Sequence, residues 1–242
     1  MTQGLYRVEY NRQLILGVWE LCLSGDTAAV TAPGQFCNIR LEGFFLRRPL
    51  SICDWDAQSL TLIYKVVGRG TAALSAVEPG QDLDLLCGLG NGFDVSKCTQ
   101  RTLVIGGGVG TPPMYGLAKA LLRAGKTPAA VLGFNTRDEI FYETEFRALG
   151  IETTVTTVDG SAGIKGFVTG ALPEDYGYYC ACGPEPMLKA VYRAARTSGL
   201  LSFEERMGCG FGACMGCSCE TRYGNKRICR DGPVLEKEEI IW

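Results

Sequence analysis

The spacing of the cysteines near the end of the chain constrains its fold more than any other feature of the sequence. Five of the twelve cysteines lie between Glu204 and Cys229, together with five glycines. Three follow a C-x4-C-x2-C pattern, and a fourth comes after eleven further residues: Cys209, Cys214, Cys217 and Cys229. This is a ligand spacing of [2Fe–2S] clusters, in which a tight loop reaches both irons and a returning strand supplies the last thiolate. The pattern predicts a [2Fe–2S] cluster held by these four residues.

The alternatives for this segment are a structural zinc site and plain buried cysteines. Structural zinc sites usually draw on two short cysteine pairs, and three crowded thiolates fit that arrangement poorly. The chain contains no histidine, which excludes a histidine general base, a Rieske centre and histidine-ligated zinc or haem. Chemistry must therefore come from thiolates, carboxylates, amines or a bound cofactor. Cys219 is left without a predicted role.

Composition limits the cellular location and the kinds of partner that we expect for the chain. Twelve cysteines, together with a polar start that lacks the features of a secretory signal, predict a reducing, cytoplasmic location. No stretch approaches ~18 to 20 apolar residues, so we expect no membrane span. The net charge of -2 gives no reason to expect nucleic acid as a partner.

Residues 1–98 are expected to form a β domain. Short apolar runs at 5–10, 36–41, 60–67 and 83–87 alternate with Gly and Pro turns. Such a rhythm predicts a small antiparallel barrel or a sandwich.

Residues 99–203 are expected to form an α/β domain, because strand and helix patterns alternate and imply a parallel sheet covered by helices. The remaining residues, 204–242, are too short for a large core and are expected to need a metal centre and their neighbours for order. We expect a strand, a glycine loop and a helix within 102–125, further strands within 128–135, 153–158 and 178–183, and further helices within 138–150 and 184–199.

A glycine loop follows the first strand of the α/β domain and opens a helix. It reads GGGVGTPP over residues 106–113. Backbone N–H groups at a helix start attract phosphate, and proline suits the first helical turn. The strict G-x-G-x-x-G pattern is not met, because Thr111 stands at the third glycine position. The loop indicates a dinucleotide site, with a structural turn as the alternative.

Two polar stretches of the β domain could bind an anionic ligand. Arg47 and Arg48 precede Pro-Leu-Ser-Ile, and a guanidinium offers a fork for a pyrophosphate. Gly68-Arg69-Gly70-Thr71 ends a strand before a short helical stretch and forms a second possible anion cradle. On spacing alone, ordinary basic turns explain these stretches slightly better.

These motifs occur in one order along the chain: RRPLSI at 47–52, the glycine loop at 106–113, CGPEPML at 182–188 and the cysteine segment from 205. In this order the chain resembles the ferredoxin–NADP reductase superfamily and, within it, the electron transfer subunits of dihydroorotate dehydrogenase B. The resemblance covers nearly all 242 residues. It implies an FAD-binding β-barrel, an NAD-binding α/β domain and a small [2Fe–2S] segment.

The resemblance also implies roles for individual residues. The glycine loop and the Cys-Gly-Pro turn flank the nicotinamide nucleotide, which implies Gly107, Gly108, Gly110 and Cys182 at NAD. For FAD it implies the stretch after the double arginine, the following strand and the second anion cradle: Arg48, Pro49, Leu50, Ser51, Lys65, Val66, Val67, Gly70 and Thr71.

The activity that the resemblance implies is an electron relay. An FMN-containing partner subunit oxidises dihydroorotate, and electrons pass through the [2Fe–2S] cluster and FAD to NAD⁺, in a heterotetramer with two subunits of each kind. The alternatives are a self-sufficient NAD(P)H-dependent reductase, or a reductase of another complex, and a zinc-stabilised module without redox activity. No residue of this chain is expected to act as a general base.

Two further residues have open interpretations. Cys180 alternates with Cys182 on one strand, so both side chains are expected on the same side, and Cys180 is expected to be a buried residue of the core. Arg137, beside the second strand of the α/β domain, could be a phosphate ligand that selects NADP, and the choice of NAD rests on the resemblance.

Overall fold

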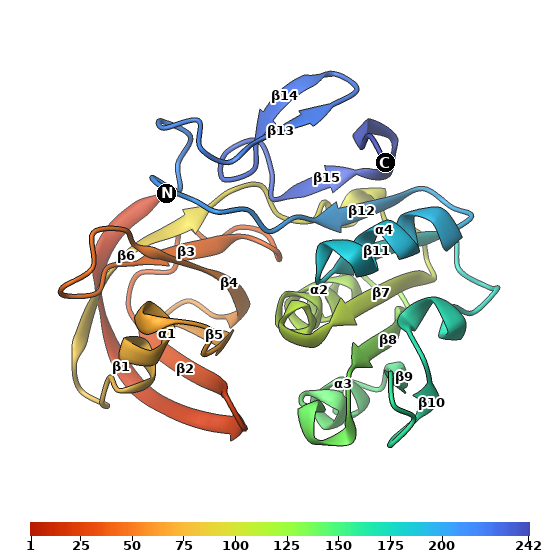
Figure 1. Cartoon of the computed structure of the whole chain (residues 1–242), viewed down its shortest axis with the longest axis horizontal. Coiled ribbons are helices and arrows are strands. Elements are labelled where there is room, and N and C mark those ends of the chain that lie inside the picture. The colour runs from red at the N-terminus through yellow and green to blue at the C-terminus, as the bar shows by residue number, and fades with distance from the viewer.

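A closed antiparallel barrel forms the N-terminal part of the computed structural model, which describes residues 1–242 (Figure 1). Its strands follow the order β1-β2-β5-β4-β3-β6. In β1 the side chains of Tyr6 and Val8 are buried and those of their neighbours are exposed, since successive strand residues face opposite sides. The bounds are β1 Thr2–Ile15, β2 Val18–Ser24, β3 Phe36–Ile39, β4 Arg48–Trp55, β5 Ser59–Lys65 and β6 Asp82–Leu89, with helix α1 Arg69–Ser75 and the 3-10 turn η1 Val95–Lys97.

A seven-stranded sheet in the order β10-β9-β8-β7-β11-β12-β15 forms the second part. Neighbouring strands are parallel except for β12 with β15. The bounds of its strands are β7 Thr102–Gly107, β8 Ala129–Phe134, β9 Glu152–Thr157, β10 Ile164–Lys165, β11 Tyr178–Cys182, β12 Gly199–Ser202 and β15 Val234–Glu236.

Helices cover both faces of this sheet, as the alternation of buried residues along β7 requires. Val104 shares a core cluster with Leu117 of α2 and Phe146 of α3, while Leu103 shares a second cluster with Leu188 of α4. No helix is long and apolar enough to cross a membrane. The bounds are α2 Thr111–Arg123, α3 Glu143–Ala148 and α4 Glu185–Ala194, with 3-10 turns η2 Gly108–Gly110, η3 Arg137–Glu139 and η4 Val168–Ala171.

The C-terminal segment is joined to the α/β domain through the sheet itself. After the cysteine loop, β13 Ser218–Thr221 and β14 Gly224–Arg227 form a hairpin, and β15 then pairs with β12 as the last strand of the large sheet. The turn η5 Lys237–Glu239 follows. Cys217, Ile228 and Cys229 belong to the same core cluster as residues of β7 and β11. The segment therefore borrows its core from the α/β domain, as its short length predicted.

The barrel and the α/β domain share a packed interface. Helix α2 crosses β4 so closely that a Cβ on Gly116 would lie 2.5 Å from the carbonyl oxygen of Cys53. Val18 and Ile63 of the barrel lie in the same core cluster as the buried face of α2. Lys119 of α2 also forms an ion pair with Asp54 of β4.

The structure confirms the predicted fold class and corrects one helix. The sequence predicted a helix within 138–150, but the α-helix runs only from Glu143 to Ala148, and a 3-10 turn takes up Arg137–Glu139. The interruption is at Tyr142, whose backbone is left-handed with φ of 65°. A right-handed helix cannot pass through that conformation.

Candidate functional site

The four predicted cluster cysteines lie in two pairs. In the first pair, Cys209 Sγ accepts backbone N–H groups from Ala213 and Cys214 at 3.2 and 3.5 Å, and Cys214 Sγ accepts the N–H of Cys209 at 3.5 Å. Burial acts to raise the pKa of Cys209, but the N–H donors of Cys214, Phe211 and Ala213 outweigh it and lower that pKa to about 6. The loop backbone therefore stabilises a thiolate, the form that binds metal.

The second pair is Cys217 and Cys229, which are 2% and 1% exposed. Cys217 Sγ accepts the N–H of Cys229 at 3.4 Å. Burial, followed by the neighbouring Cys217 thiol, raises the pKa of Cys229 to about 12. Nowhere in the chain do three or more Cys, Asp or Glu side chains gather closely enough to hold one metal ion. Two pairs, each with backbone N–H donors, fit a binuclear cluster with two thiolates on each iron better than a single zinc.

The cysteine loop is attached to the barrel through Asn38, which sequence reasoning missed. Its amide nitrogen donates to the carbonyl oxygen of Cys209 at 3.3 Å, and a Cβ on Gly210 would lie 2.4 Å from that nitrogen. The amide oxygen of Asn38 is buried without a hydrogen-bond partner. A buried amide in the otherwise apolar strand Phe36–Ile39 is the signal that could have identified it. Cys219 lies on β13, half-buried and outside both pairs.

The two neighbouring arginines of the barrel have different surroundings. Arg47 is mostly buried and forms a two-pronged ion pair with Asp84, with N–O distances of 3.0 Å. The guanidinium of Arg48 instead lies over the ring of Phe44, at 4.8 Å, and against Gly70, where a Cβ would lie 1.9 Å from Arg48 Nε. Arg48 makes no ion pair, so its charge remains available to an anionic ligand.

The predicted flavin residues gather at one end of the barrel. Strand β4 pairs with β5 only from Ile52 onward, so the edge of Arg48–Ser51 that faces β5 is unpaired. Val67 is 80% exposed, and its N–H and that of Gly68 donate to Thr71 Oγ1 at 2.9 and 3.3 Å. The structure thus brings together the residues predicted on β4, after β5 and in α1. Arg48 Nη1 donates to the carbonyl oxygens of Leu46 and Arg47, at 2.5 and 3.3 Å, but no carboxylate neutralises the guanidinium. The unpaired strand edge and this charge fit a flavin and its pyrophosphate.

The predicted nucleotide residues also meet. A Cβ on Gly110 would lie 2.2 Å from the carbonyl oxygen of Cys182, and one on Gly107 would lie 2.3 Å from the sulfur of Met187. Gly108 is left-handed, with φ of 51°. The loop leads directly into α2, whose first turn contains two prolines. At Gly110 only glycine allows this approach to the backbone of Cys182, and a glycine loop at a helix start fits a nucleotide phosphate.

Cys182 and Cys180 differ in environment although they share a side of β11. Cys182 is half-buried; burial raises its pKa to about 12 despite the nearby Ser202 hydroxyl, so the thiol is neutral. Cys180 is fully buried, with its sulfur 3.8 Å from that of Cys98, as expected for a core residue. Arg137 donates from Nε and Nη2 to the carbonyl oxygen of Ser161, at 3.0 and 2.7 Å, which leaves it fewer donors for a phosphate.

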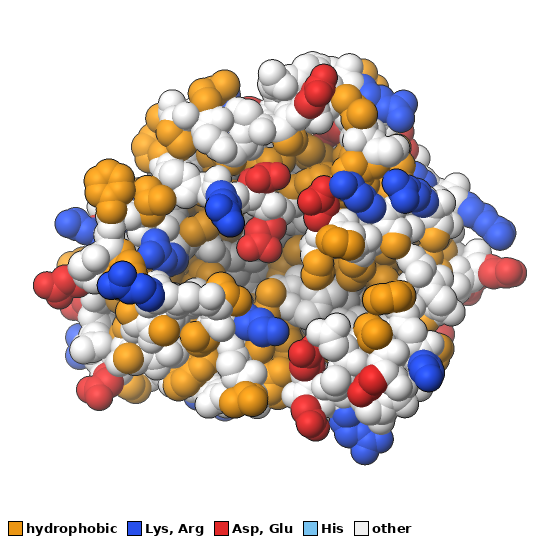
Figure 2. Space-filling view, in the orientation of Figure 1, with side chains coloured by type: hydrophobic (Ala, Val, Ile, Leu, Met, Phe, Trp, Pro, Cys, Tyr) orange, Lys and Arg blue, Asp and Glu red, His pale blue; other side chains and the backbone are white.

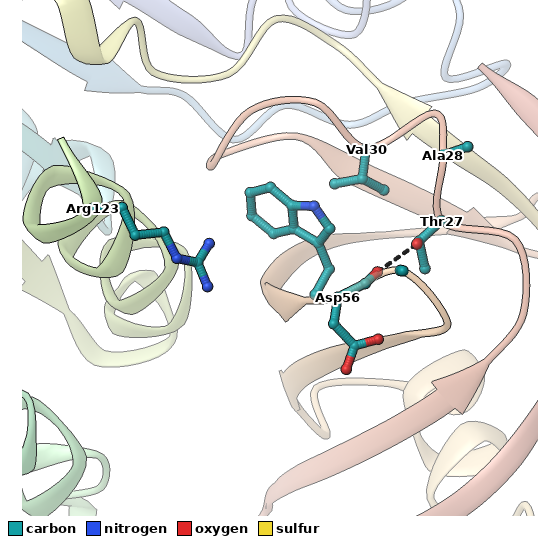
Figure 3. Close-up of a pocket in the computed structure, with 7 residues that line it drawn as sticks. Thr27, Ala28, Val30, Asp56 and Arg123 are labelled. Carbon is teal, nitrogen blue, oxygen red and sulfur yellow. Dashed lines mark hydrogen bonds between the residues drawn. The ribbon is translucent and has the colours of Figure 1, made fainter.

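Two cavities of the structure lie away from these residues. Their volumes are about 360 and 580 Å³, and they share Trp55 and Arg123 in their linings and contain none of the predicted cofactor residues. Figure 3 shows Arg123 of α2 facing the barrel residues across the first one. The space-filling view instead shows a hollow between the barrel and the α/β domain, on the face where Figure 1 places α1 and α4 (Figure 2). We assign the functional site to this hollow because the two predicted sets of cofactor residues come from the elements around it.

Comparisons with known proteins agree with this geometry. An "Oxidoreductase NAD-binding domain" model matches residues 104–193, and an "Iron-sulfur cluster binding domain of dihydroorotate dehydrogenase B" model matches residues 204–241. The structure of an NADH-dependent reduced ferredoxin–NADP oxidoreductase superposes with a TM-score of 0.88 at 31% identity, covering 99% of this chain and 90% of that one. A ferredoxin NADP⁺ reductase from Neisseria gonorrhoeae, at 15% identity, TM-score 0.70 and coverages of 80% and 90%, shows the fold alone.

The matched NAD-binding model and the 31% identical reductase structure, together with this barrel and α/β domain, make this chain an oxidoreductase of the ferredoxin–NADP reductase class. The "Dihydroorotate dehydrogenase B (NAD(+)), electron transfer subunit" of Geobacillus sp. (strain WCH70) is 44% identical, covering 100% of this chain and 99% of its own length. The protein of the same name from Fusobacterium nucleatum is 41% identical, with 96% of each chain covered. The chain belongs to the family of dihydroorotate dehydrogenase B electron transfer subunits, which confirms the resemblance seen in the sequence.

Proposed function

We propose that this chain is the electron transfer subunit of an NAD-dependent dihydroorotate dehydrogenase in pyrimidine biosynthesis. The observation that carries the proposal is the paired-cysteine loop, whose segment adds strand β15 to the sheet of the α/β domain beside a reductase-type barrel. Full-length similarity to relatives of that name supports it. The proposed domains are residues 1–98, which bind FAD, residues 99–203, which bind NAD, and residues 204–242, which bind the cluster.

The residues proposed for each group follow from these surroundings. Cys209, Cys214, Cys217 and Cys229 hold the [2Fe–2S] cluster, and Gly107, Gly108, Gly110 and Cys182 line the NAD site. The FAD site is formed by Arg48, Pro49, Leu50, Ser51, Lys65, Val66, Val67, Gly70 and Thr71.

When bound, the flavin exchanges single electrons with the cluster and a hydride with NAD⁺. The chain's own residues bind and orient. Arg48 neutralises phosphate charge, Thr71 holds the turn at Val67 and Gly68, and Gly110 lets the glycine loop lie against the backbone of Cys182. The neutral Cys182 thiol adds no negative charge beside the nicotinamide. No side chain is required to move a proton in a hydride transfer.

The name "electron transfer subunit" implies a catalytic partner. We propose that this partner contains FMN and oxidises dihydroorotate to orotate, releasing two electrons and two protons. We further propose that two subunits of each kind form a heterotetramer in the cytoplasm.

A second candidate is an NAD(P)H-dependent reductase of another acceptor. The likeness to the NADH-dependent reduced ferredoxin–NADP oxidoreductase structure, at 31% identity over nearly the whole chain, favours this alternative over any non-redox module. Titration of the chain with dihydroorotate, in the presence and absence of the purified partner, distinguishes the electron transfer subunit from a reductase of another acceptor. Electron transfer from dihydroorotate to NAD⁺ only when both subunits are present supports the first candidate.

An anaerobic NADH titration of the purified chain, followed by low-temperature EPR, tests the proposal. We expect flavin bleaching together with a rhombic signal of a reduced [2Fe–2S] cluster. A silent spectrum from protein that contains zinc and no flavin would refute the relay.

The flavin site is tested by substituting the two neighbouring arginines. Arg48→Ala is expected to lose FAD on gel filtration, while its flavin-free form keeps the melting temperature of the flavin-free unsubstituted chain. Arg47→Ala, the matched control, is expected to melt earlier because Asp84 loses its buried partner. Full flavin retention in Arg48→Ala would contradict the assignment.

A further inference from the structure

Tyr142 connects the two large domains through a hydrogen bond. Its hydroxyl donates to Oε1 of Glu20 on β2, at 3.0 Å. Arg12 on β1 donates to Oε2 of the same carboxylate from Nε and Nη2, at 2.7 and 2.6 Å. Glu20 is only 5% exposed. One buried carboxylate therefore accepts from both domains, and each of its oxygens is occupied.

The backbone of Tyr142 is held in an unfavourable conformation. Its φ of 65° and ψ of 4° are left-handed, which is rare for a bulky residue and costs conformational energy. Glycine would adopt this conformation without that cost. The ring packs edge-on against Tyr115 of α2, with centroids 5.1 Å apart. Burial raises the pKa of Tyr142 far above its usual value, so the phenol keeps the proton that it donates. The contacts of the Tyr142 side chain, rather than its backbone conformation, therefore explain why a tyrosine occupies this position.

The bond lies beside the strands that carry the functional site. Glu20 pairs with Ile63 of β5, and Val18 pairs with Lys65 at the end of the same strand. Strand β5 also contacts the turn Gly108–Gly110 of the glycine loop. A shift of Tyr142 relative to Glu20 would therefore change the spacing between the residues proposed for flavin and those proposed for nucleotide.

We propose that Tyr142 and Glu20 are positioning residues, whose hydrogen bond across the domain interface fixes the spacing between Lys65–Val67 and the glycine loop. The proposal rests on the proposed function, because that spacing affects the reaction only if hydride passes between the two sites. A misplacement of about 1 Å in reacting groups can cost on the order of a hundredfold in rate. Neither residue touches the reacting atoms, and both act through the geometry of the interface.

The experiment uses the full chain with its cofactors and compares Tyr142→Phe with Tyr115→Phe. Both variants remove one hydroxyl from the same aromatic cluster, but no hydrogen bond involves the Tyr115 hydroxyl. Hydrogen exchange followed by mass spectrometry is the first readout. In Tyr142→Phe we expect exchange about fivefold faster in β2 and in residues 135–142, in line with the loss of one hydrogen bond. Tyr115→Phe should exchange like the unsubstituted chain.

Single-turnover flavin reduction by NADH is the second readout. Tyr142→Phe should lower the rate constant at saturating NADH about fivefold or more while leaving the NADH dissociation constant unchanged, since the nucleotide contacts remain. Glu20→Met removes the acceptor from the barrel side. If the two residues act through one bond, the double variant should be no slower than the slower single variant.

Two results would overturn the proposal. The first is a Tyr142→Phe variant that matches Tyr115→Phe in both readouts. The second is faster exchange with an unchanged rate constant, which would make the bond structural only. Failure of the proposed function looks different, because the unsubstituted chain with its flavin would then not be reduced by NADH at all.

Discussion

The cysteine loop and the end of strand β11 place the same side chain in opposite electrostatic environments. At Cys209, burial acts against ionisation, but the N–H groups of a tight loop prevail and the pKa falls to about 6. At Cys182, burial prevails and the pKa rises to about 12. The first environment suits a metal-binding thiolate, and the second keeps a neutral thiol at the proposed nucleotide site. The difference shows that converging backbone donors, rather than residue type, set the pKa of a cysteine thiol. The pKa does not by itself mark a cluster ligand, because the pKa of Cys229 is also raised to about 12 and its place in the ligand set rests on its spacing.

The largest expected effect is on iron content. Cys209→Ala should lose nearly all of its iron, because one of four cluster ligands is gone, whereas Cys182→Ala should retain it. Iron and acid-labile sulfide per chain measure the outcome. A full complement of iron in Cys209→Ala would contradict the assignment of Cys209 as a cluster ligand.

The reactivity of Cys182 sharpens the comparison. Because its pKa is about 12, its thiolate fraction at pH 7 is small, and we expect alkylation on the order of a thousandfold slower than for a free thiol. The rate should rise about tenfold per pH unit from pH 7 to 10 without levelling off. Peptide mapping after timed iodoacetamide labelling measures it. A plateau near pH 8 or 9, as in ordinary thiols, would show that burial does not control this site.

Removal of the Cys182 thiol should have a smaller effect on the reaction with NADH. Cys182→Ala is expected to lower the rate of flavin reduction by about fivefold, the equivalent of one contact worth about 1 kcal/mol. Stopped-flow absorbance of the anaerobic holoprotein measures it. Cys219→Ala is the control, since Cys219 lies outside both sites. Equal rates of flavin reduction in Cys182→Ala and Cys219→Ala would contradict the assignment of Cys182 to the nucleotide site.

The smallest expected effect concerns the support of the cysteine loop. Asn38→Ala removes the amide that donates to the carbonyl of Cys209, so we expect a loss of about 1 kcal/mol in the free energy of unfolding and a melting temperature lower by ~2–4 °C. Asn225→Ala, on the exposed hairpin strand β14, should leave the melting temperature unchanged. Thermal unfolding of the holoprotein tests the pair, and identical curves would mean that Asn38 does not hold the loop.

Much of the fold was readable in the sequence because its signals are local. Strand periodicity, the glycine loop and the cysteine spacing each depend on neighbouring residues, and the structure contains the expected barrel and parallel sheet. The predicted helix within 138–150 was too long. Its pattern is helical, but Tyr142 adopts a left-handed backbone to reach Glu20, 122 residues earlier in the chain. No local propensity encodes such a contact.

The sequence by itself determined the fold class and the candidate ligand and cofactor residues, since ligand spacing and glycine positions are properties of short segments. Only the tertiary structure decided which of two adjacent arginines is available, because Asp84 comes from another strand and occupies Arg47. The same holds for the pKa difference between Cys209 and Cys182 and for the link from Asn38 to the cysteine loop. Burial and long-range hydrogen bonds arise when distant segments pack together, and a linear pattern does not contain them.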